Sequence, residues 1–171
     1  MRIIEFGGEQ YPEFQAEGFA AKFAFPYARQ VCRGNGYDVG ANCAEWTFPN
    51  AIGIDSSFEE PYNDALNLPT IPEWESGYAD YIFSSHCLEH IPDWVRALDH
   101  WTVKIRPGGV MFLYLPDFSQ KYWRPWNNTK HVSVFTPEII RSYFEDSVLW
   151  TNIFVSGIDL NNSFMLMAER V

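Results

Sequence analysis

Residues 36–55, GYDVGANCAEWTFPNAIGID, carry side chains whose types and order could do chemistry. A short apolar run ends at Gly40, a polar loop follows, and a second apolar run ends at Asp55. Glycine lets the backbone approach a ligand closely. A carboxylate at a strand end can accept two hydrogen bonds from a ribose diol. The order of these residues therefore predicts a site for a nucleotide-like cofactor.

Two later segments extend this pattern of polar strand ends. We expect NDALNLP (63–69) to form a third strand, with Asp64 placed to accept a hydrogen bond from an adenine amino group. Ser84 and Ser85 end a fourth strand, ADYIFSS (79–85), although two serines also suit an ordinary strand-to-helix turn. Four suitable strand ends favour one shared ligand site at the edge of a sheet.

The next residues, His86-Cys87-Leu88-Glu89-His90, spell the H-x-x-E-H motif of inverted zinc peptidases. That motif needs both histidines on one helical face. A strand is expected up to Ser85, and Pro92 disfavours a helical residue before it. We therefore predict no metal ion, with Glu89 and His90 as helix-start and packing residues. Cys43 and Cys87 are expected to be buried, inert thiols rather than a redox or metal pair.

Helices are expected between these strands. Apolar residues at helical spacing predict a helix over 19–31, which Pro26 should kink or break. A second helix is expected over 88–105, with Pro92 in its first turn and the RPGG segment ending it. Thr136 is the expected N-cap of a third helix. The apolar face of the second helix should comprise Leu88, Ile91, Val95, Leu98, Thr102 and Ile105.

Three more apolar runs predict strands at VMFLYL (110–115), VLWTNIFVSG (148–157) and SFMLMAERV (163–171). Strands that alternate with helices require crossover connections and a mostly parallel sheet. The last two runs are joined through IDLNN (158–162). The fold class is therefore α/β, with ligands expected at the carboxyl ends of the parallel strands.

Composition limits the possible partners. The chain has 171 residues, of which 47% are hydrophobic, so we expect one domain over 1–171 with a substantial core. A net charge of −10 without a basic cluster argues against nucleic acid or an anionic membrane as the main partner. Three cysteines are too few for a disulfide scaffold, and the start shows no signal-peptide core, which favours a cytoplasmic protein.

One family fits the combined pattern. The segment YADYIFSSHCLEHIPDWVRALDHWTVKIRPGGVMFLYLPD (78–117) resembles class I S-adenosylmethionine-dependent methyltransferases of the type 11 group. These proteins share its order of strand, LEH, amphipathic helix, PGG and strand. HVSVFTPEIIRSYF (131–144) is similar to a later family segment. The resemblance implies a three-layer, Rossmann-like sheet of about seven strands with a C-terminal antiparallel hairpin.

The resemblance also implies roles for the strand-end residues. The loop around the methionine part of S-adenosylmethionine would be Asp38, Gly40, Ala41 and Asn42. Asp55, with Ser56 beside it, would hold the ribose hydroxyls. Asp64 and Ala65 would border the adenine, and the residues beneath the sulfonium would be Ser84, Ser85 and His86.

The first loop departs from the family pattern of Asp-x-Gly-x-Gly-x-Gly. Asn42 and Ala44 stand where glycine is usual. Asparagine tolerates left-handed backbone angles better than most residues, so the turn can survive. The connection NCAEWTFPN (42–50) leaves room for little more than one helical turn. We therefore expect a stunted or absent crossover helix and an open cofactor pocket.

The substrate is expected over the long segment 117–135. Tyr122, Trp123 and Trp126 could form a flat, partly polar wall suited to sugar rings or aromatic small molecules. His131 is the expected general base, and His86 is expected to orient cofactor or substrate. The acidic charge favours O-methylation of a small molecule or glycan, with N-methylation left open. The alternatives are a catalytically inactive, methyltransferase-like binding module and a nicotinamide-binding oxidoreductase.

Overall fold

A computed structural model describes residues 2–74, 78–121 and 130–171. The strands are β1 (Ile3–Phe6), β2 (Glu9–Pro12), β3 (Gly36–Val39), β4 (Ala51–Ile54), β5 (Ala79–Ser85), β6 (Ile105–Pro116), β7 (Trp150–Val155) and β8 (Ser163–Arg170). The helices are α1 (Glu13–Ala16), α2 (Ala21–Val31), α3 (Trp94–Lys104) and α4 (Pro137–Glu145), with 3₁₀ turns η1 (Ala44–Trp46) and η3 (Leu88–His90).

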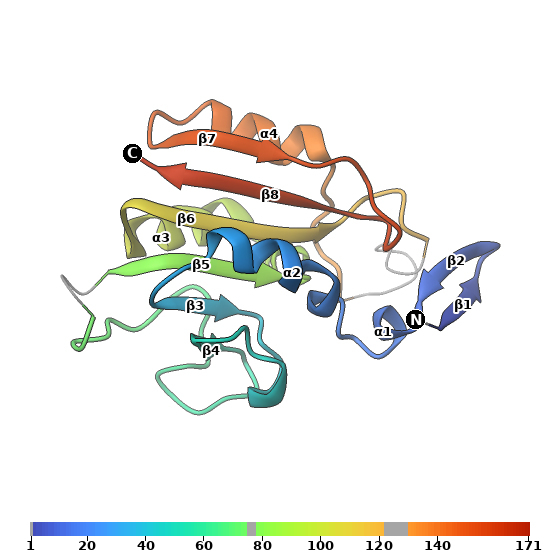
Figure 1. The fold of residues 1–171 in the computed structure, drawn as a ribbon, viewed down its shortest axis with the longest axis horizontal. Helices are drawn as coiled ribbons and strands as arrows, with labels where there is room; N and C mark the ends of the chain where they lie inside the picture. The colour runs from blue at the N-terminus through green and yellow to red at the C-terminus, as the bar shows by residue number, and fades with distance from the viewer. Residues whose placement is uncertain (1, 75–77, 122–129) are drawn as a thin grey trace.

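The central sheet has the order β4-β3-β5-β6-β8-β7 (Figure 1). Strands β4, β3, β5 and β6 pair in parallel, and β8 pairs antiparallel with both β6 and β7. This arrangement confirms the predicted α/β fold with a C-terminal antiparallel hairpin. The sheet has six strands in the described part of the chain, where about seven were expected.

The missing strand is the one expected over 63–69. The Asp64 carboxylate accepts a hydrogen bond from the Leu66 backbone N–H, and the Asp64 carbonyl accepts one from Asn67. These bonds fold the segment into a turn, because an aspartate side chain can replace a neighbouring strand as hydrogen-bond acceptor. Leu68 is buried all the same, and its N–H donates to Nε2 of His100.

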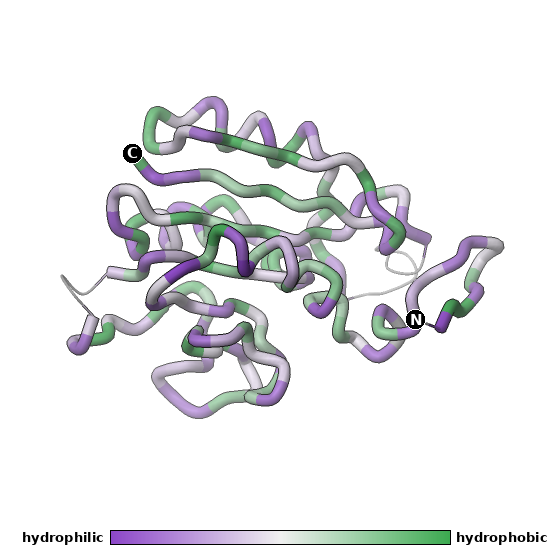
Figure 2. Tube along the Cα trace, viewed as in Figure 1, coloured by the Kyte–Doolittle hydropathy of each residue, from purple (hydrophilic) through white to green (hydrophobic). Residues whose placement is uncertain are grey.

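Helices cover both faces of the sheet (Figure 1). Ala24 and Ala28 of α2 are buried against one face, together with Phe83 and Phe112. α3 and α4 cover the other face, where Trp101 is fully buried. Hydrophobic residues accordingly concentrate along the central strands (Figure 2). No helix among the described residues is long and apolar enough to span a membrane.

Two helix predictions need correction. The predicted break at Pro26 is wrong, because α2 runs unbroken through this residue. The missing proline N–H leaves the carbonyl of Lys22 free, and Lys22 is exposed, so water can satisfy it. The second helix begins only at Trp94, because Asp93 caps it by accepting from the Arg96 N–H. Pro92 therefore lies before this helix. Val95 is 41% exposed, and Trp101 replaces it on the buried face.

The N-terminal residues form an antiparallel hairpin of β1 and β2, followed by α1, which the sequence analysis did not predict. The hairpin extends beyond the end of the sheet (Figure 1). Lys121 ties it to the segment after β6, since its ammonium group contacts the Glu9 carboxylate at 2.8 Å and the Gly7 carbonyl at 3.2 Å. This attachment brings residues 15–21 to the carboxyl ends of the parallel strands.

The cap of α4 gives a test of local stability. Thr136 Oγ1 accepts from the Ile139 N–H, as the sequence predicts, and Pro137 begins the helix. Thr136→Ala should lower the free energy of unfolding by about 1 kcal/mol, measured by urea denaturation. Thr136→Ser keeps the hydroxyl and should remain close to the wild type. Equal losses in both variants would show that the hydroxyl is not what stabilises this helix end.

Candidate active site

A cleft of about 800 Å³ opens at the carboxyl ends of β3, β4 and β5. This is the place where parallel α/β sheets bind ligands. Most of the residues predicted for the site line it, namely Asp38, Gly40, Ala41, Asn42, Asp55, Ser56, Ala65, Ser85, His86 and His131. The predicted wall residues Tyr122, Trp123 and Trp126 lie outside the described part of the chain.

The loop after β3 has the tight conformation that its sequence permits. Gly40 has a φ of 89°, and a Cβ at this position would overlap with Cβ of Cys87, so only glycine fits. Asn42 has a φ of 63°, which confirms that asparagine can keep the turn where the family has glycine. These two conformations keep the loop folded tightly at the end of β3, beside the cleft.

Asp55 joins this loop to the end of β4. Its carboxylate accepts from the Asn42 N–H at 3.0 Å and from the Ser57 N–H at 2.9 Å. The Ser57 hydroxyl in turn donates to the Asn42 carbonyl. A carboxylate has about four acceptor positions, so two bonds leave capacity for the hydroxyls of a ligand. Asp55 lines the cleft, as its predicted role requires.

The connection between β3 and β4 contains only the 3₁₀ turn η1, which confirms the predicted loss of the crossover helix. Asp38 holds this connection in place, because its carboxylate accepts from the Phe48 N–H at 2.6 Å. Burial raises the pKa of Asp38 to about 7, against a smaller lowering by the Phe48 hydrogen bond, and the nearby Asp55 raises it further. Asp38 thus lies at the floor of the cleft with little solvent around it.

Two predicted cofactor residues do not line the cleft. Ser84 is fully buried, and its hydroxyl donates to the Val39 carbonyl at 2.8 Å, which ties β5 to β3. The Asp64 carboxylate is directed to the Leu66 N–H. Their neighbours Ser85, Asn63 and Ala65 do line the cleft. The expectation that ligands bind at the carboxyl ends of parallel strands identified the correct edge of the sheet. It could not decide which of two adjacent residues lines the cleft.

Gln15 is a site residue that the sequence analysis missed. It lines the cleft, is 1% exposed, and neither atom of its side-chain amide has a hydrogen-bond partner among the described residues. Phe19 and Trp46 also line the cleft and stack on each other at 4.5 Å. Nothing local to residues 13–18 signals this role, since it depends on how the N-terminal hairpin folds back.

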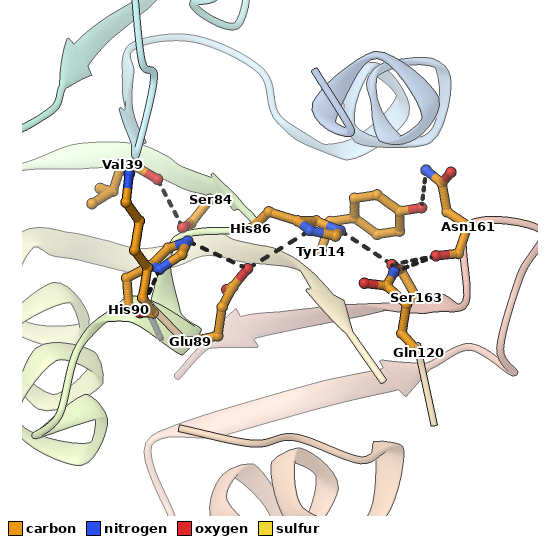
Figure 3. Close-up of polar contacts among 10 residues, drawn as sticks. Val39, Ser84, His86, Glu89, His90, Tyr114, Gln120, Asn161 and Ser163 are labelled. Atoms are coloured by element: carbon orange, nitrogen blue, oxygen red, sulfur yellow. Dashed lines mark hydrogen bonds and ion pairs between the residues drawn. The ribbon is translucent and has the colours of Figure 1, made fainter. Parts of the chain in front are cut away.

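Four side chains form a histidine–carboxylate cluster at the cleft, His86, Glu89, His90 and His131 (Figure 3 shows the first three). Glu89 Oε1 lies 3.7 Å from His86 Nδ1 and 3.9 Å from His90 Nε2. The His90 and His131 rings meet edge to face at 4.7 Å. His131 reaches Glu89 because the Val132 and Ser133 N–H groups both donate to the Glu89 carbonyl.

His86, Glu89 and His131 are largely shielded from solvent, whereas the His90 side chain is 39% exposed. Burial changes the acid–base behaviour of Glu89 and His86. Glu89 is 1% exposed, and burial raises the pKa of its carboxyl to about 8. Burial lowers the pKa of His86 to about 3, with further lowering from His131 and His90. His86 is therefore neutral near pH 7, which suits the orienting role predicted for it rather than that of a base. Burial likewise raises the pKa of the Cys87 thiol, as expected for an inert cysteine.

The H-x-x-E-H motif does not form the helical zinc site of a peptidase. Leu88–His90 is a single 3₁₀ turn, and His86 lies before it in a left-handed conformation, with a φ of 49°. The two histidines therefore approach Glu89 from different backbone directions, as Figure 3 shows. The predicted absence of that helical motif is confirmed.

Comparison with known families identifies the chain. Residues 1–147 match the family model described as a methyltransferase domain. The chain belongs to this family. The match confirms the resemblance to class I S-adenosylmethionine-dependent methyltransferases and replaces the nicotinamide-binding alternative. Among curated proteins no match was found.

Solved structures support the same fold. A methyltransferase from Thermotoga maritima, described as a possible histamine N-methyltransferase, has a TM-score of 0.70 and 15% identity, over 92% of this chain and 93% of that one. The N-methyltransferase NodS from Bradyrhizobium japonicum WM9, in complex with S-adenosyl-L-homocysteine, has a TM-score of 0.57 and 15% identity, over 92% of this chain and 87% of that one. An O-methyltransferase family protein from Burkholderia thailandensis has a TM-score of 0.55 and 16% identity, over 92% of this chain and 58% of that one.

The buried Asp38 carboxyl should make this methyltransferase less stable as pH rises. Its pKa is about 7 in the folded protein, against an ordinary value of 3.8, so the folded state binds more protons between these values. The free energy of unfolding should therefore fall from about pH 4 to pH 7, by at most about 4 kcal/mol at roughly 1.4 kcal/mol per pKa unit.

Urea denaturation between pH 5 and pH 8 measures this slope. Asp38→Asn keeps an oxygen acceptor for the Phe48 N–H and should make the slope below pH 7 less steep, whereas Asp146→Asn on the surface should leave it unchanged. Some slope should remain in Asp38→Asn, because the pKa of the buried Glu89 is also raised, to about 8. A slope below pH 7 as steep as that of the wild type would show that Asp38 does not contribute to it.

Proposed function

We propose that this methyltransferase transfers the methyl group of S-adenosylmethionine to a hydroxyl oxygen of a small molecule or glycan. The observation that carries the proposal is the histidine–carboxylate cluster, which lies in the same cleft as Gly40 and Asp55. A hydroxyl needs to lose a proton during transfer, and an imidazole at the cleft can accept it.

The residues present fit S-adenosylmethionine. The Asp55 carboxylate has free acceptor positions for ribose hydroxyls, and the tight loop formed by Gly40, Ala41 and Asn42 lines the same cleft. The buried Gln15 amide offers a donor and an acceptor that nothing else in the described residues satisfies. When bound, S-adenosylmethionine supplies an electrophilic methyl group, and its transfer to a hydroxyl yields a methyl ether, a neutral sulfide and a proton.

The acceptor hydroxyl is proposed to lose its proton at the histidine–carboxylate cluster. His131 is 7% exposed but lines the cleft, and its ring rests against His90. His86 is held by Ser163 at 3.1 Å and serves to orient the ligands. Similar solved structures include N-methyltransferases. An amine acceptor that already has a free lone pair has less need of a group that accepts a proton than a hydroxyl has.

The charge of the chain supports a small or neutral acceptor. A net charge of −10 disfavours a polyanion at the cleft. Tyr122, Trp123 and Trp126 are proposed as an aromatic wall for sugar or aromatic rings, because the segment that contains them runs between β6 and His131.

Cofactor binding tests the first half of the proposal. Asp55→Ala should weaken S-adenosylhomocysteine binding by about 1.5–3 kcal/mol, roughly 10- to 150-fold, because it removes a charged acceptor of hydrogen bonds. Isothermal titration calorimetry measures the change. Asp64→Ala is the matched control, since its carboxylate serves a local turn, and it should bind as the wild type does. Equal loss in both variants would remove the specific role of Asp55.

Methyl transfer tests the second half. Wild-type protein with S-adenosylmethionine and a panel of phenols, sugars and amines should release S-adenosylhomocysteine with the hydroxyl acceptors, followed by mass spectrometry. His131→Ala should lower kcat about 100-fold and leave cofactor affinity within a factor of about three. Transfer to amines alone would overturn the O-methylation proposal. Binding of cofactor with no transfer to any acceptor would favour the inactive binding module.

A further inference from the structure

We propose that Glu89, His90 and His131 bind a divalent transition-metal ion at the wall of the cofactor cleft. One ligand atom from each of these residues lies within 4.8 Å of the other two. Three of the four histidines in the chain belong to the histidine–carboxylate cluster. The Glu89 side chain is 1% exposed, and neither of its oxygens accepts a hydrogen bond from another described residue.

The hydrogen bond of His90 leaves Nε2, the ring nitrogen nearer Glu89, available to bind a metal ion. Its Nδ1 lies 2.8 Å from the Lys130 carbonyl, which can only accept, so Nδ1 carries the proton. In a neutral ring, Nε2 then holds a lone pair, and it lies 3.9 Å from Glu89 Oε1. A histidine that binds a metal usually donates its other N–H to a carbonyl or carboxylate in this way.

The orientation of His86 adds a second lone pair at the same place. The Ser163 hydroxyl donates its hydrogen to the Asn161 carbonyl, so it accepts from His86 Nε2. His86 Nδ1 is then unprotonated, and it faces Glu89 Oε1 at 3.7 Å (Figure 3). Two imidazole lone pairs therefore converge on a buried carboxylate, and these groups repel one another unless a proton or a metal ion lies between them.

The donor set indicates the kind of cation. Two imidazoles and one carboxylate suit Zn²⁺ and its first-row neighbours, whereas Mg²⁺ and Ca²⁺ prefer oxygen donors alone. Metal–ligand bonds of about 2.1 Å in a tetrahedral site would place the ligand atoms roughly 3.4 Å apart. The distance of 3.9 Å between Glu89 Oε1 and His90 Nε2 therefore needs only a small side-chain movement to fit. Three protein ligands leave at least one position open, as in catalytic rather than structural zinc sites.

An open metal position in this cleft would deepen the proposed function, on which this part of the inference rests. An acceptor oxygen at that position would lose its proton to solvent more easily, because a divalent ion lowers the pKa of a coordinated hydroxyl. The acceptor class would then be oxygen donors, with His131 as a ligand. The sequence analysis predicted no metal because it considered His86, Glu89 and His90 together and Cys43 and Cys87 as a pair, whereas His131 is 41 residues beyond His90.

Cobalt binding tests the site, since Co²⁺ replaces Zn²⁺ and absorbs visible light according to its coordination. Chelator-treated protein, titrated with Co²⁺ alone, should bind one equivalent and develop a visible band of four- or five-coordinate metal. Glu89→Gln and His131→Ala should each weaken binding by about 100-fold or more and remove the band. His100→Gln is the matched control: Gln can still accept from the Leu68 N–H, and binding should be unchanged.

Calorimetry with S-adenosylhomocysteine separates this inference from the proposed function. Asp55→Ala should lose cofactor affinity and keep the cobalt band. Cofactor binding without a one-equivalent cobalt band would overturn the metal site and leave the methyltransferase proposal standing. Cobalt binding that disappears equally in His100→Gln would identify adventitious histidine binding and likewise overturn the site.

Discussion

The hydrogen bond from the Phe48 N–H to the buried Asp38 carboxylate is the constraint on which the cofactor cleft depends. A parallel βαβ unit normally joins its strands through a crossover helix, whose internal hydrogen bonds fix the connection. Here β3 and β4 are joined by eleven residues with one 3₁₀ turn. The connection therefore needs a partner from the sheet itself, and Asp38, at the penultimate position of β3, provides it.

The anchored Phe48 also replaces the missing helix as a cover for the sheet. Its ring stacks on Phe83 at 4.8 Å and meets Phe25 of α2 edge to face at 5.3 Å. Aromatic pairs of this kind add about 0.5–1.5 kcal/mol beyond the area they bury. One aromatic side chain thus closes a face that a helix would otherwise cover. The carboxylate that holds it is desolvated, which explains why its pKa is raised although it accepts a short hydrogen bond.

The sequence correctly predicted elements whose formation depends on local periodicity and local side-chain chemistry. The strand over 79–85 and the cap at Thr136 follow from periodicity and side-chain chemistry, and both were found as predicted. The errors arose where a neighbour overrides the local preference. Asp64 turned an apolar segment away from the sheet through its own side chain. Exposure allowed Pro26 to stay inside a helix, and the position of Gln15 depends on a hairpin attached more than a hundred residues away, at Lys121.

The histidine–carboxylate cluster shows why site chemistry is harder to predict than fold. His86, Glu89 and His90 are adjacent in sequence, and their spacing was correctly judged unsuitable for a helical metal site. The deciding contact is made by backbone groups, because two N–H groups after His131 donate to the Glu89 carbonyl and bring a third imidazole to the same carboxylate. No side-chain pattern signals such a contact. A buried carboxylate facing lone pairs is unfavourable unless a proton or a metal ion neutralises it, so an apparent defect in the hydrogen bonding of the protein is the feature that points to its chemistry.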